Sequence, residues 1–206
     1  ERECSTQRRH QKIIEIAPAP GIKKELKEKM FDASVALIKS SKYEGLATVE
    51  FLVNYAKEDY KFIECNARLQ VEHTVTEAVL GLDLVRAQIQ IASGKTLKQL
   101  KLEQKNIPEP KGFAIQSRVN MEVIDSEGEI KPSGGKFISF DLPSGPGVRS
   151  DSYGYSGYET NPAFDSLIAK VITHSPEDNF KQALKRNYRS LCEFKIEGVP
   201  TNLDLL

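Results

Sequence analysis

The sequence predicts an α+β fold built from two parts. In the first part, two stretches with helical periodicity flank an alternating, hairpin-like pattern over residues 48–66. The second part begins near residue 112, alternates apolar and polar residues in short stretches, and ends in one amphipathic segment. Side chains repeat every two residues along a strand and every 3.6 along a helix, so the patterns separate strands from helices.

Two amphipathic helices are expected in the first part. A Pro- and Gly-rich stretch at 17–21 breaks the chain, and the apolar spacing after it predicts a helix that ends near 43–45. Asp83 is expected to cap the second helix, which Gly94 ends. The apolar stripe of the first helix comprises Ile22, Leu26, Met30, Ala33 and Leu37.

Between these helices, residues 46–53 and 60–66 alternate like two half-buried strands. The polar residues 56–59 between them predict a turn, so the pair is expected to form a β-hairpin.

The second part follows a charged connection over residues 97–111, where we place the domain boundary. Strands are expected at 113–121, 136–141 and 166–173. Ser175-Pro176-Glu177-Asp178 is similar to a capping box with Pro at the first helical position, which predicts the start of the last helix.

Basic and acidic residues balance, with 29 of each kind. This argues against a general nucleic-acid or anionic-membrane surface, although a local basic patch is compatible with it. No apolar run approaches the roughly 20 residues of a membrane span. We therefore expect neither nucleic acid nor membrane as a partner.

The three cysteines lie far apart in sequence and form no CxxC pair. Free thiols in a reducing compartment are the simplest interpretation, which favours the cytoplasm, or the mitochondrial matrix if the source is eukaryotic. The charged first residues do not look like a signal peptide. Because the chain does not begin with Met, we expect it to be a piece of a longer protein.

The hairpin carries an unusual pair of carboxylates. Folding at 56–59 brings Glu50 roughly opposite Glu64, about 5 Å away, where like charges repel. A divalent cation between them would relieve the repulsion, and with the amide oxygen of Asn66 the oxygen ligands suit Mg²⁺ or Mn²⁺. Alternatively, one carboxylate faces solvent, or Lys57 or Lys61 pairs with it.

The segment after Asn66 adds groups that bind and activate anions. Arg68 can grip a planar oxyanion, and Glu72 could act as a base four residues later. Together with a metal, they suggest chemistry on phosphate and a small carboxylate-like anion. A loop of mixed charges is the competing interpretation.

Several stretches resemble the biotin carboxylase family, the ATP-grasp component of biotin-dependent carboxylases. The most specific is FIECNARLQVEHTVTEAVLGLDLVRAQIQIASGKTL, and the others follow in family order over essentially the whole chain. They are ERECSTQRRHQKIIEIAPAP, GFAIQSRVN, SGYETNPAFDSLIAKVI and IEGVPTNLDLL.

The resemblance implies a specific architecture. Residues 1–96 would form the C-terminal part of an ATP-grasp domain, residues 97–111 the connection, and residues 112–206 a biotin carboxylase C-terminal domain with a mixed or antiparallel sheet and helices. The family's unit is about twice as long, so its N-terminal part, with most of the lid, would be missing here.

The resemblance also implies roles for individual residues. The metal ligands that bridge the ATP phosphates would be Glu50, Glu64 and Asn66. The ATP-binding residues would be Gln7, His10, Glu50, Leu52 and Glu64. Bicarbonate and biotin would be bound by Lys12, Gln70, Val71 (through its backbone N–H) and Arg118. The catalytic residues would be Arg68 near bicarbonate, Glu72 as the general base, and Arg118 at the enolate-like oxygen of biotin.

In this family bicarbonate attacks ATP to give carboxyphosphate, which supplies CO₂ to biotin. The implied cofactors are ATP, Mg²⁺ or Mn²⁺, and carrier-linked biotin. The implied partners are a biotin carboxyl carrier, a carboxyltransferase, the missing N-terminal part, and a second copy in a homo-oligomer. The alternatives are an ATP-grasp ligase of the carbamoyl-phosphate-synthase type and a non-catalytic interaction fragment.

Overall fold

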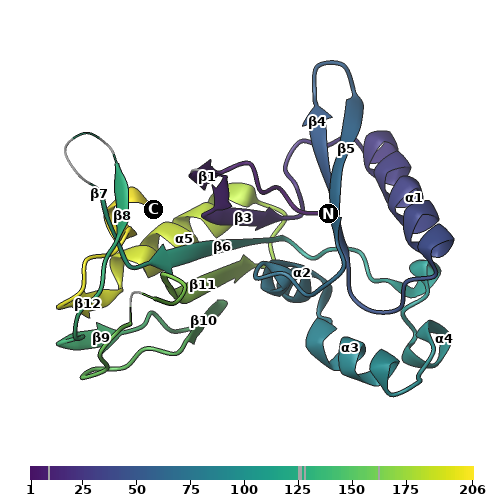
Figure 1. The fold of residues 1–206 in the computed structure, drawn as a ribbon. Helices are drawn as coiled ribbons and strands as arrows, with labels where there is room; N and C mark the ends of the chain where they lie inside the picture. Colours follow the sequence, from purple (N-terminus) through teal and green to yellow (C-terminus); the bar gives the residue numbers. More distant parts are fainter. Residues whose placement is uncertain (9, 125–126, 128, 162) are drawn as a thin grey trace.

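The computed structural model describes residues 1–8, 10–124, 127, 129–161 and 163–206. Figure 1 shows a hairpin with a long helix beside it on one side of the molecule, and a sheet backed by a helix on the other. The elements up to the connection are β1 (Gln7–Arg8), β2 (Gln11–Lys12), β3 (Ile14–Ala17), α1 (Lys24–Ser41), β4 (Thr48–Asn54), β5 (Asp59–Asn66), α2 (His73–Leu80) and α3 (Leu84–Ala92). The remaining elements are α4 (Leu97–Leu100), η1 (Gln104–Asn106), β6 (Phe113–Asn120), β7 (Glu122–Ile124), β8 (Ile130–Pro132), β9 (Ser139–Asp141), β10 (Val148–Ser152), β11 (Leu167–Ser175), α5 (Phe180–Cys192), β12 (Lys195–Glu197) and η2 (Leu203–Leu205).

The main sheet has four antiparallel strands in the order β10-β11-β6-β3. Its outer strand β3 comes from the start of the chain, where Glu15 pairs with Gln116 of β6. The N-terminal segment therefore completes a sheet whose other strands belong to the second part, across the predicted boundary at 97–111, which stays a prediction.

The two faces of this sheet pack against different helices. On one face, Val75 and Val79 of α2 form a buried cluster with Ala114 and Ile172 of the sheet. On the other face lies α5, where the hydroxyl of Ser117 donates a hydrogen bond to Asn187. Since neighbouring residues of a strand point to opposite faces, the even-numbered residues of β6 point toward α2.

A second core cluster fills the end of the second part. It is buried around Phe137 and Phe140, whose ring centroids lie 4.8 Å apart. The other buried members are Val119, Met121, Ile168, Ala169 and Val199.

The expected hairpin and the first two predicted helices are confirmed. Strands β4 and β5 pair in the predicted hairpin, α1 occupies the predicted span, and the side chain of Asp83 caps α3 by accepting a hydrogen bond from the N–H of Arg86. The stripe of α1 is less buried than its spacing suggested, because Leu26 is its only buried member among the described residues.

One local prediction is wrong, and one helix was not predicted. The last helix does not start at the Ser175–Asp178 capping box, because Ser175 still pairs with Phe113 in the sheet and Asn179 caps α5 instead. The segment after Arg68 is not only a loop of mixed charges, since it runs into α2, a helix the patterns did not predict. Among the described residues, no helix combines the length and the apolar character that crossing a membrane requires.

Candidate active site

The hairpin places the predicted metal ligands together. Glu50 stands directly opposite Glu64, and a register irregularity follows at once between Glu50 and Phe51. The amide nitrogen of Asn66 donates to Oε1 of Glu64 at 2.8 Å and to Oε1 of Glu50 at 3.2 Å. Lys61 pairs with Asp59 at 3.1 Å, so this lysine does not neutralise the carboxylate pair.

The residues present fit a hard divalent cation. Two carboxylates converge with one amide, and rotation of that amide by half a turn would direct Oδ1 of Asn66 toward both carboxylates. No group of three or more His, Cys, Asp or Glu side chains able to hold a metal occurs in the described part of the chain. The site would therefore hold its ion with two carboxylates, one amide and oxygens of the substrate.

Lys12 joins this cluster from β2. Its ammonium donates to Oε1 of Glu50 at 2.7 Å and to Oε1 of Glu72 at 2.9 Å. Burial by itself lowers the pKa of Lys12, but the hydrogen bonds to Glu50 and Glu72 outweigh it and hold the pKa above its ordinary value. For Glu50, burial raises the pKa, and its bonds from Gln70 and Lys12 hold the net pKa below the ordinary range.

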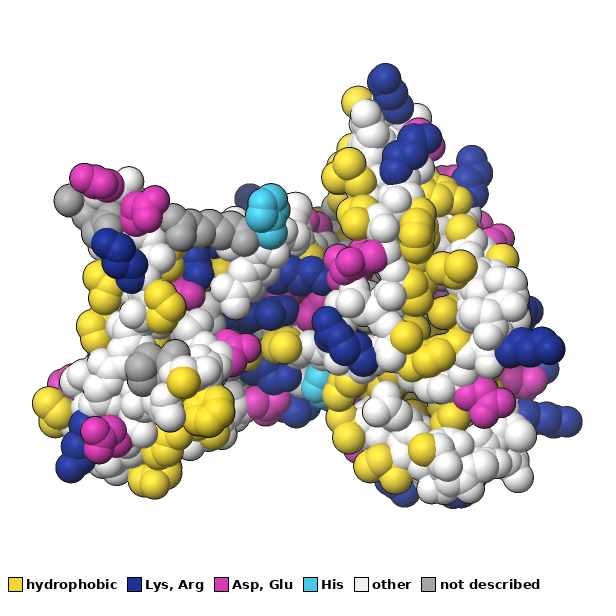
Figure 2. Space-filling model, in the orientation of Figure 1, with side chains coloured by type: hydrophobic (Ala, Val, Ile, Leu, Met, Phe, Trp, Pro, Cys, Tyr) yellow, Lys and Arg dark blue, Asp and Glu magenta, His cyan; other side chains and the backbone are white. Residues whose placement is uncertain are grey.

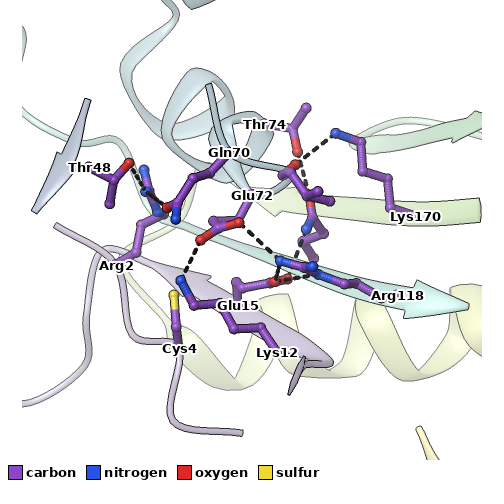
Figure 3. Close-up of polar contacts among 12 residues, drawn as sticks. Arg2, Cys4, Lys12, Glu15, Thr48, Gln70, Glu72, Thr74, Arg118 and Lys170 are labelled. Atoms are coloured by element: carbon purple, nitrogen blue, oxygen red, sulfur yellow. Dashed lines mark hydrogen bonds and ion pairs between the residues drawn. The ribbon is translucent and has the colours of Figure 1, made fainter. Parts of the chain in front are cut away.

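Glu72 is the centre of the arrangement. It lies at the start of α2 with its side chain only 2% exposed. One carboxylate oxygen accepts from Lys12, and the other accepts from Nη2 of Arg118 at 3.0 Å (Figure 3). Burial raises the pKa of Glu72, but the hydrogen bond and charge of Lys12 outweigh it, so the net pKa lies below the ordinary value.

Arg118 is held from behind by residues that the sequence analysis missed. Its Nε donates to Oε1 of Glu15 at 2.6 Å, and Nη2 also contacts that oxygen. The other oxygen of Glu15 accepts from the side-chain amide of Gln116 at 2.8 Å. The hydroxyl of Thr74 donates to the side-chain oxygen Oε1 of Gln116 at 2.5 Å. Burial raises the pKa of Glu15, and Arg118 only partly offsets it. No local motif marks these residues, because the pairing of β3 with β6 brings them together.

Arg2 is a further residue that the sequence analysis missed. Its guanidinium donates to the hydroxyls of Thr76 at 3.0 Å and Thr48 at 3.1 Å. It also donates to the side-chain oxygen Oε1 of Gln70 at 3.5 Å. Gln70 in turn donates its amide to Glu50 at 2.9 Å. Arg2 thus fixes which end of the Gln70 amide faces the carboxylates.

Val71 and Arg68 lie at the edges of this network. The carbonyl of Val71 accepts from Nζ of Lys170 at 2.8 Å, and burial lowers the pKa of that lysine. Arg68 is exposed and donates to the Oδ1 of Asn66 at 3.3 Å, which places its charge beside the carboxylate pair.

A cleft of about 480 Å³ opens beside part of this network. Its lining includes Gln7, Lys12, Glu50, Leu52 and Glu72, so it gathers predicted nucleotide and bicarbonate residues. Figure 2 shows basic and acidic side chains gathered in the hollow between the hairpin side and the sheet side.

His10 lies outside the lining of this cleft, whereas Cys4 is part of it. His10 sits in the exposed turn between β1 and β2 with a φ of 64° and is not part of the cleft lining. Cys4 does line the cleft, and burial raises the pKa of its thiol to about 12.

Two arginines form ion pairs between the first and second parts of the chain. Arg8 pairs with Glu122 at 2.5 Å, and Arg149 pairs with Glu77 at 3.1 Å.

Comparisons with known proteins find relatives along nearly the whole chain. The family model described as "Carbamoyl-phosphate synthase L chain, ATP binding domain" matches residues 1–100, and "Biotin carboxylase C-terminal domain" matches residues 116–206. The chain is 44% identical to Biotin carboxylase 1 of Bacillus subtilis over 98% of its own length and 43% of that protein. It is 46% identical to Pyruvate carboxylase 1 of Caenorhabditis elegans over 100% of its length and 17% of that protein.

A solved structure of a single-chain, multi-domain long-chain acyl-CoA carboxylase superimposes with a TM-score of 0.93 at 44% identity, covering 98% of this chain and 21% of that one. The fold is thus that of an ATP-grasp domain portion joined to a biotin carboxylase C-terminal domain. The chain belongs to the biotin carboxylase family. It spans less than half the length of each of these relatives.

Proposed function

We propose that this chain forms part of the biotin carboxylase component of a biotin-dependent carboxylase, called the parent enzyme below. That component would carboxylate biotin with bicarbonate in an ATP- and Mg²⁺- or Mn²⁺-dependent reaction. The observation that carries the proposal is that both carboxylate oxygens of Glu72 accept hydrogen bonds from cations, one from Lys12 and the other from Arg118. Lys12 also connects Glu72 to the Glu50–Glu64 pair.

The reaction has two steps. A bicarbonate oxygen attacks the γ-phosphorus of ATP, ADP leaves, and carboxyphosphate forms. Carboxyphosphate then breaks into CO₂ and phosphate, the phosphate takes the proton from the ureido nitrogen of biotin, and that nitrogen attacks CO₂. Positioning and charge stabilisation supply most of the catalysis in phosphoryl transfer.

Each residue has a defined task in this proposal. Glu72, kept ionised by Lys12, accepts the proton of bicarbonate, while Lys12, Arg68, Gln70 and the Val71 N–H orient the anion. Arg118 stabilises the developing oxyanion of biotin. Glu50, Glu64 and Asn66 would hold the metal ion, which supplies positive charge at the ATP phosphates. Gln7 and Leu52 would contact the nucleotide, and His10 would approach it from its turn.

The test is bicarbonate-dependent ATP cleavage by the parent enzyme. Glu64→Ala and Arg68→Ala are each expected to lower turnover by about 10²-fold, the scale on which one transition-state contact acts. Glu58→Ala is the matched control, because Glu58 lies on the same hairpin and pairs only with the exposed Lys23 among the described residues. Unchanged turnover in both site variants would refute the assigned roles.

One alternative has its own support, since the model that matches residues 1–100 takes its name from carbamoyl-phosphate synthase. Carboxylation of free biotin separates the two activities. The match of residues 116–206 to a biotin carboxylase C-terminal domain favours biotin as acceptor.

We also propose that the 206-residue chain alone is inactive. Leu52, expected at the adenine, is 68% exposed, so the proposed nucleotide site is open to solvent at this residue. The parent enzyme would add the N-terminal part of the ATP-grasp unit, a biotin carboxyl carrier, a carboxyltransferase and a second copy of itself. Its location in the cytoplasm or mitochondrial matrix stays a prediction. Biotin-dependent ATP cleavage by the isolated chain would contradict its proposed inactivity.

A further inference from the structure

Glu15 is a buried carboxylate at the centre of the sheet. Its side chain has no exposed surface. Burying a carboxylate is costly unless hydrogen bonds and a cation compensate, and removing a partner from such a pair is strongly destabilising. Keeping an ionisable side chain at this buried position therefore costs folding free energy, and packing alone does not explain why it is kept.

The partners of Glu15 lie on one strand. Oε1 contacts Nε and Nη2 of Arg118, and Oε2 accepts from Nε2 of Gln116. Because β3 pairs with β6 at Glu15 and Gln116, the backbone ladder fixes the carboxylate relative to both partners. Figure 3 shows Glu15 lying against Arg118, with Glu72 and Lys12 beside them.

Arg118 is shared by two carboxylates that are held differently. Nη2 contacts both Glu15 and Glu72, whereas Nε donates to Glu15. Glu72 has a second cation in Lys12, but Lys12 makes no contact with Glu15 among the described contacts. If Nη2 leaves Glu72 for a substrate oxygen, Glu72 stays neutralised by Lys12 and Arg118 stays anchored by Nε.

We propose that Glu15 is a positioning residue for Arg118, holding its Nε edge so that its outer edge can move between Glu72 and the biotin oxygen. The inference rests on the proposed function and deepens it. Glu15 touches neither substrate nor reacting atoms, so its effect passes entirely through Arg118. Its loss should impair the use of biotin more than the use of ATP or bicarbonate.

The test is Glu15→Gln in the parent enzyme, assayed for carboxylation of free biotin. Glutamine keeps the size and one acceptor but removes the charge. We expect KM for biotin to rise about tenfold, corresponding to the loss of one charge-assisted hydrogen bond. KM for ATP and for bicarbonate should change less than twofold.

The matched control is Glu122→Gln, since Glu122 is also a buried carboxylate paired with an arginine, Arg8, but outside the Glu72 network. It should lower thermal stability and leave KM for biotin unchanged. In an Arg118→Gln background, Glu15→Gln should add nothing to the biotin defect, because the two residues act as one unit.

A second variant covers loss of folding. Gln116→Leu keeps the carboxyl group of Glu15 and its contact with Arg118 but removes its other hydrogen bond, and it should raise KM for biotin about threefold. The inference would be overturned if KM for biotin were unchanged in Glu15→Gln or in Gln116→Leu, measured in whichever of these two variants folds. If the wild-type parent enzyme does not carboxylate biotin at all, the proposed function fails instead, so the two failures are distinguishable.

Discussion

The ammonium of Lys12 lies 2.9 Å from Oε1 of Glu72 and compensates the burial of that carboxylate. Lys12 also donates to Glu50, so one cation joins the expected base to the expected metal ligand. The protonation state of Glu72 therefore depends on a residue sixty positions earlier in the chain.

Lys12→Met should shift the pH dependence of the parent enzyme. Without the ammonium, Glu72 loses the hydrogen bond and the charge of Lys12 that lower its pKa, so the pKa of Glu72 rises. The base then becomes protonated at higher pH than before, so the acidic limb of the kcat/KM profile should move to higher pH. Lys23→Met, at an exposed salt bridge with Glu58, is the control and should leave the profile in place. An acidic limb that stays put in Lys12→Met would contradict the assignment of Glu72 as base.

Arg2→Met should weaken the binding of bicarbonate. The variant loses the bonds to Thr48 and Thr76 and frees the Gln70 amide to turn. We expect KM for bicarbonate to rise several-fold, on the scale of one charge-assisted hydrogen bond. Thr76→Val removes only one of these bonds and should have a smaller effect. Equal KM values for wild type and Arg2→Met would show that Gln70 needs no such support.

Thr74→Val should destabilise the fold. Thr74 is 1% exposed, and its hydroxyl donates to the buried side-chain oxygen of Gln116. The variant leaves that oxygen without this hydrogen bond. An unsatisfied buried acceptor costs about 1–3 kcal/mol. Thr74→Ser, which keeps the hydroxyl, is the control, and denaturant unfolding gives the comparison. If both variants lose the same stability, the hydrogen bond contributes nothing.

Gly112→Ala should be far more damaging than Gly81→Ala. Both glycines have positive φ, 62° and 65°, so the intrinsic backbone cost of about 1–2 kcal/mol is shared. A Cβ at Gly112 would lie 1.9 Å from the carbonyl oxygen of Ser175, whereas nothing lies within 4 Å at Gly81. Thermal unfolding should therefore show a modest shift for Gly81→Ala and a large one for Gly112→Ala. Similar shifts would mean that the β11 end gives way easily.

Local patterns predicted the local structure well. The pairing of Glu50 with Glu64 follows from alternation and a short turn, and helices α1 and α3 follow from their spacing and stop signals. The roles of Lys12 and Arg118 came instead from the resemblance of whole motifs, and those roles stay proposals.

Non-local structure could not be predicted in this way. β3 has only four residues, and the Pro- and Gly-rich stretch that ends it does not indicate which strand it pairs with, so its place in the sheet depends on partners a hundred positions away. Glu15 looks like any charged residue until that pairing buries it. The start of α5 was mispredicted for the same non-local reason. The capping signal at Ser175 does not start a helix, because Ser175 pairs with Phe113 in the sheet.

The pairing of β3 with β6 also constrains how this chain can be exchanged with its relatives. A chimaera of this chain and a relative, joined at residues 97–111, would combine the edge strand β3 from one protein with the other three strands of the sheet from the second protein. Glu15 and Arg118 would then come from different sources, and their fit would depend on both. Swapping the second part together with residues 1–17 would transplant the intact sheet, and would make the cleaner hybrid.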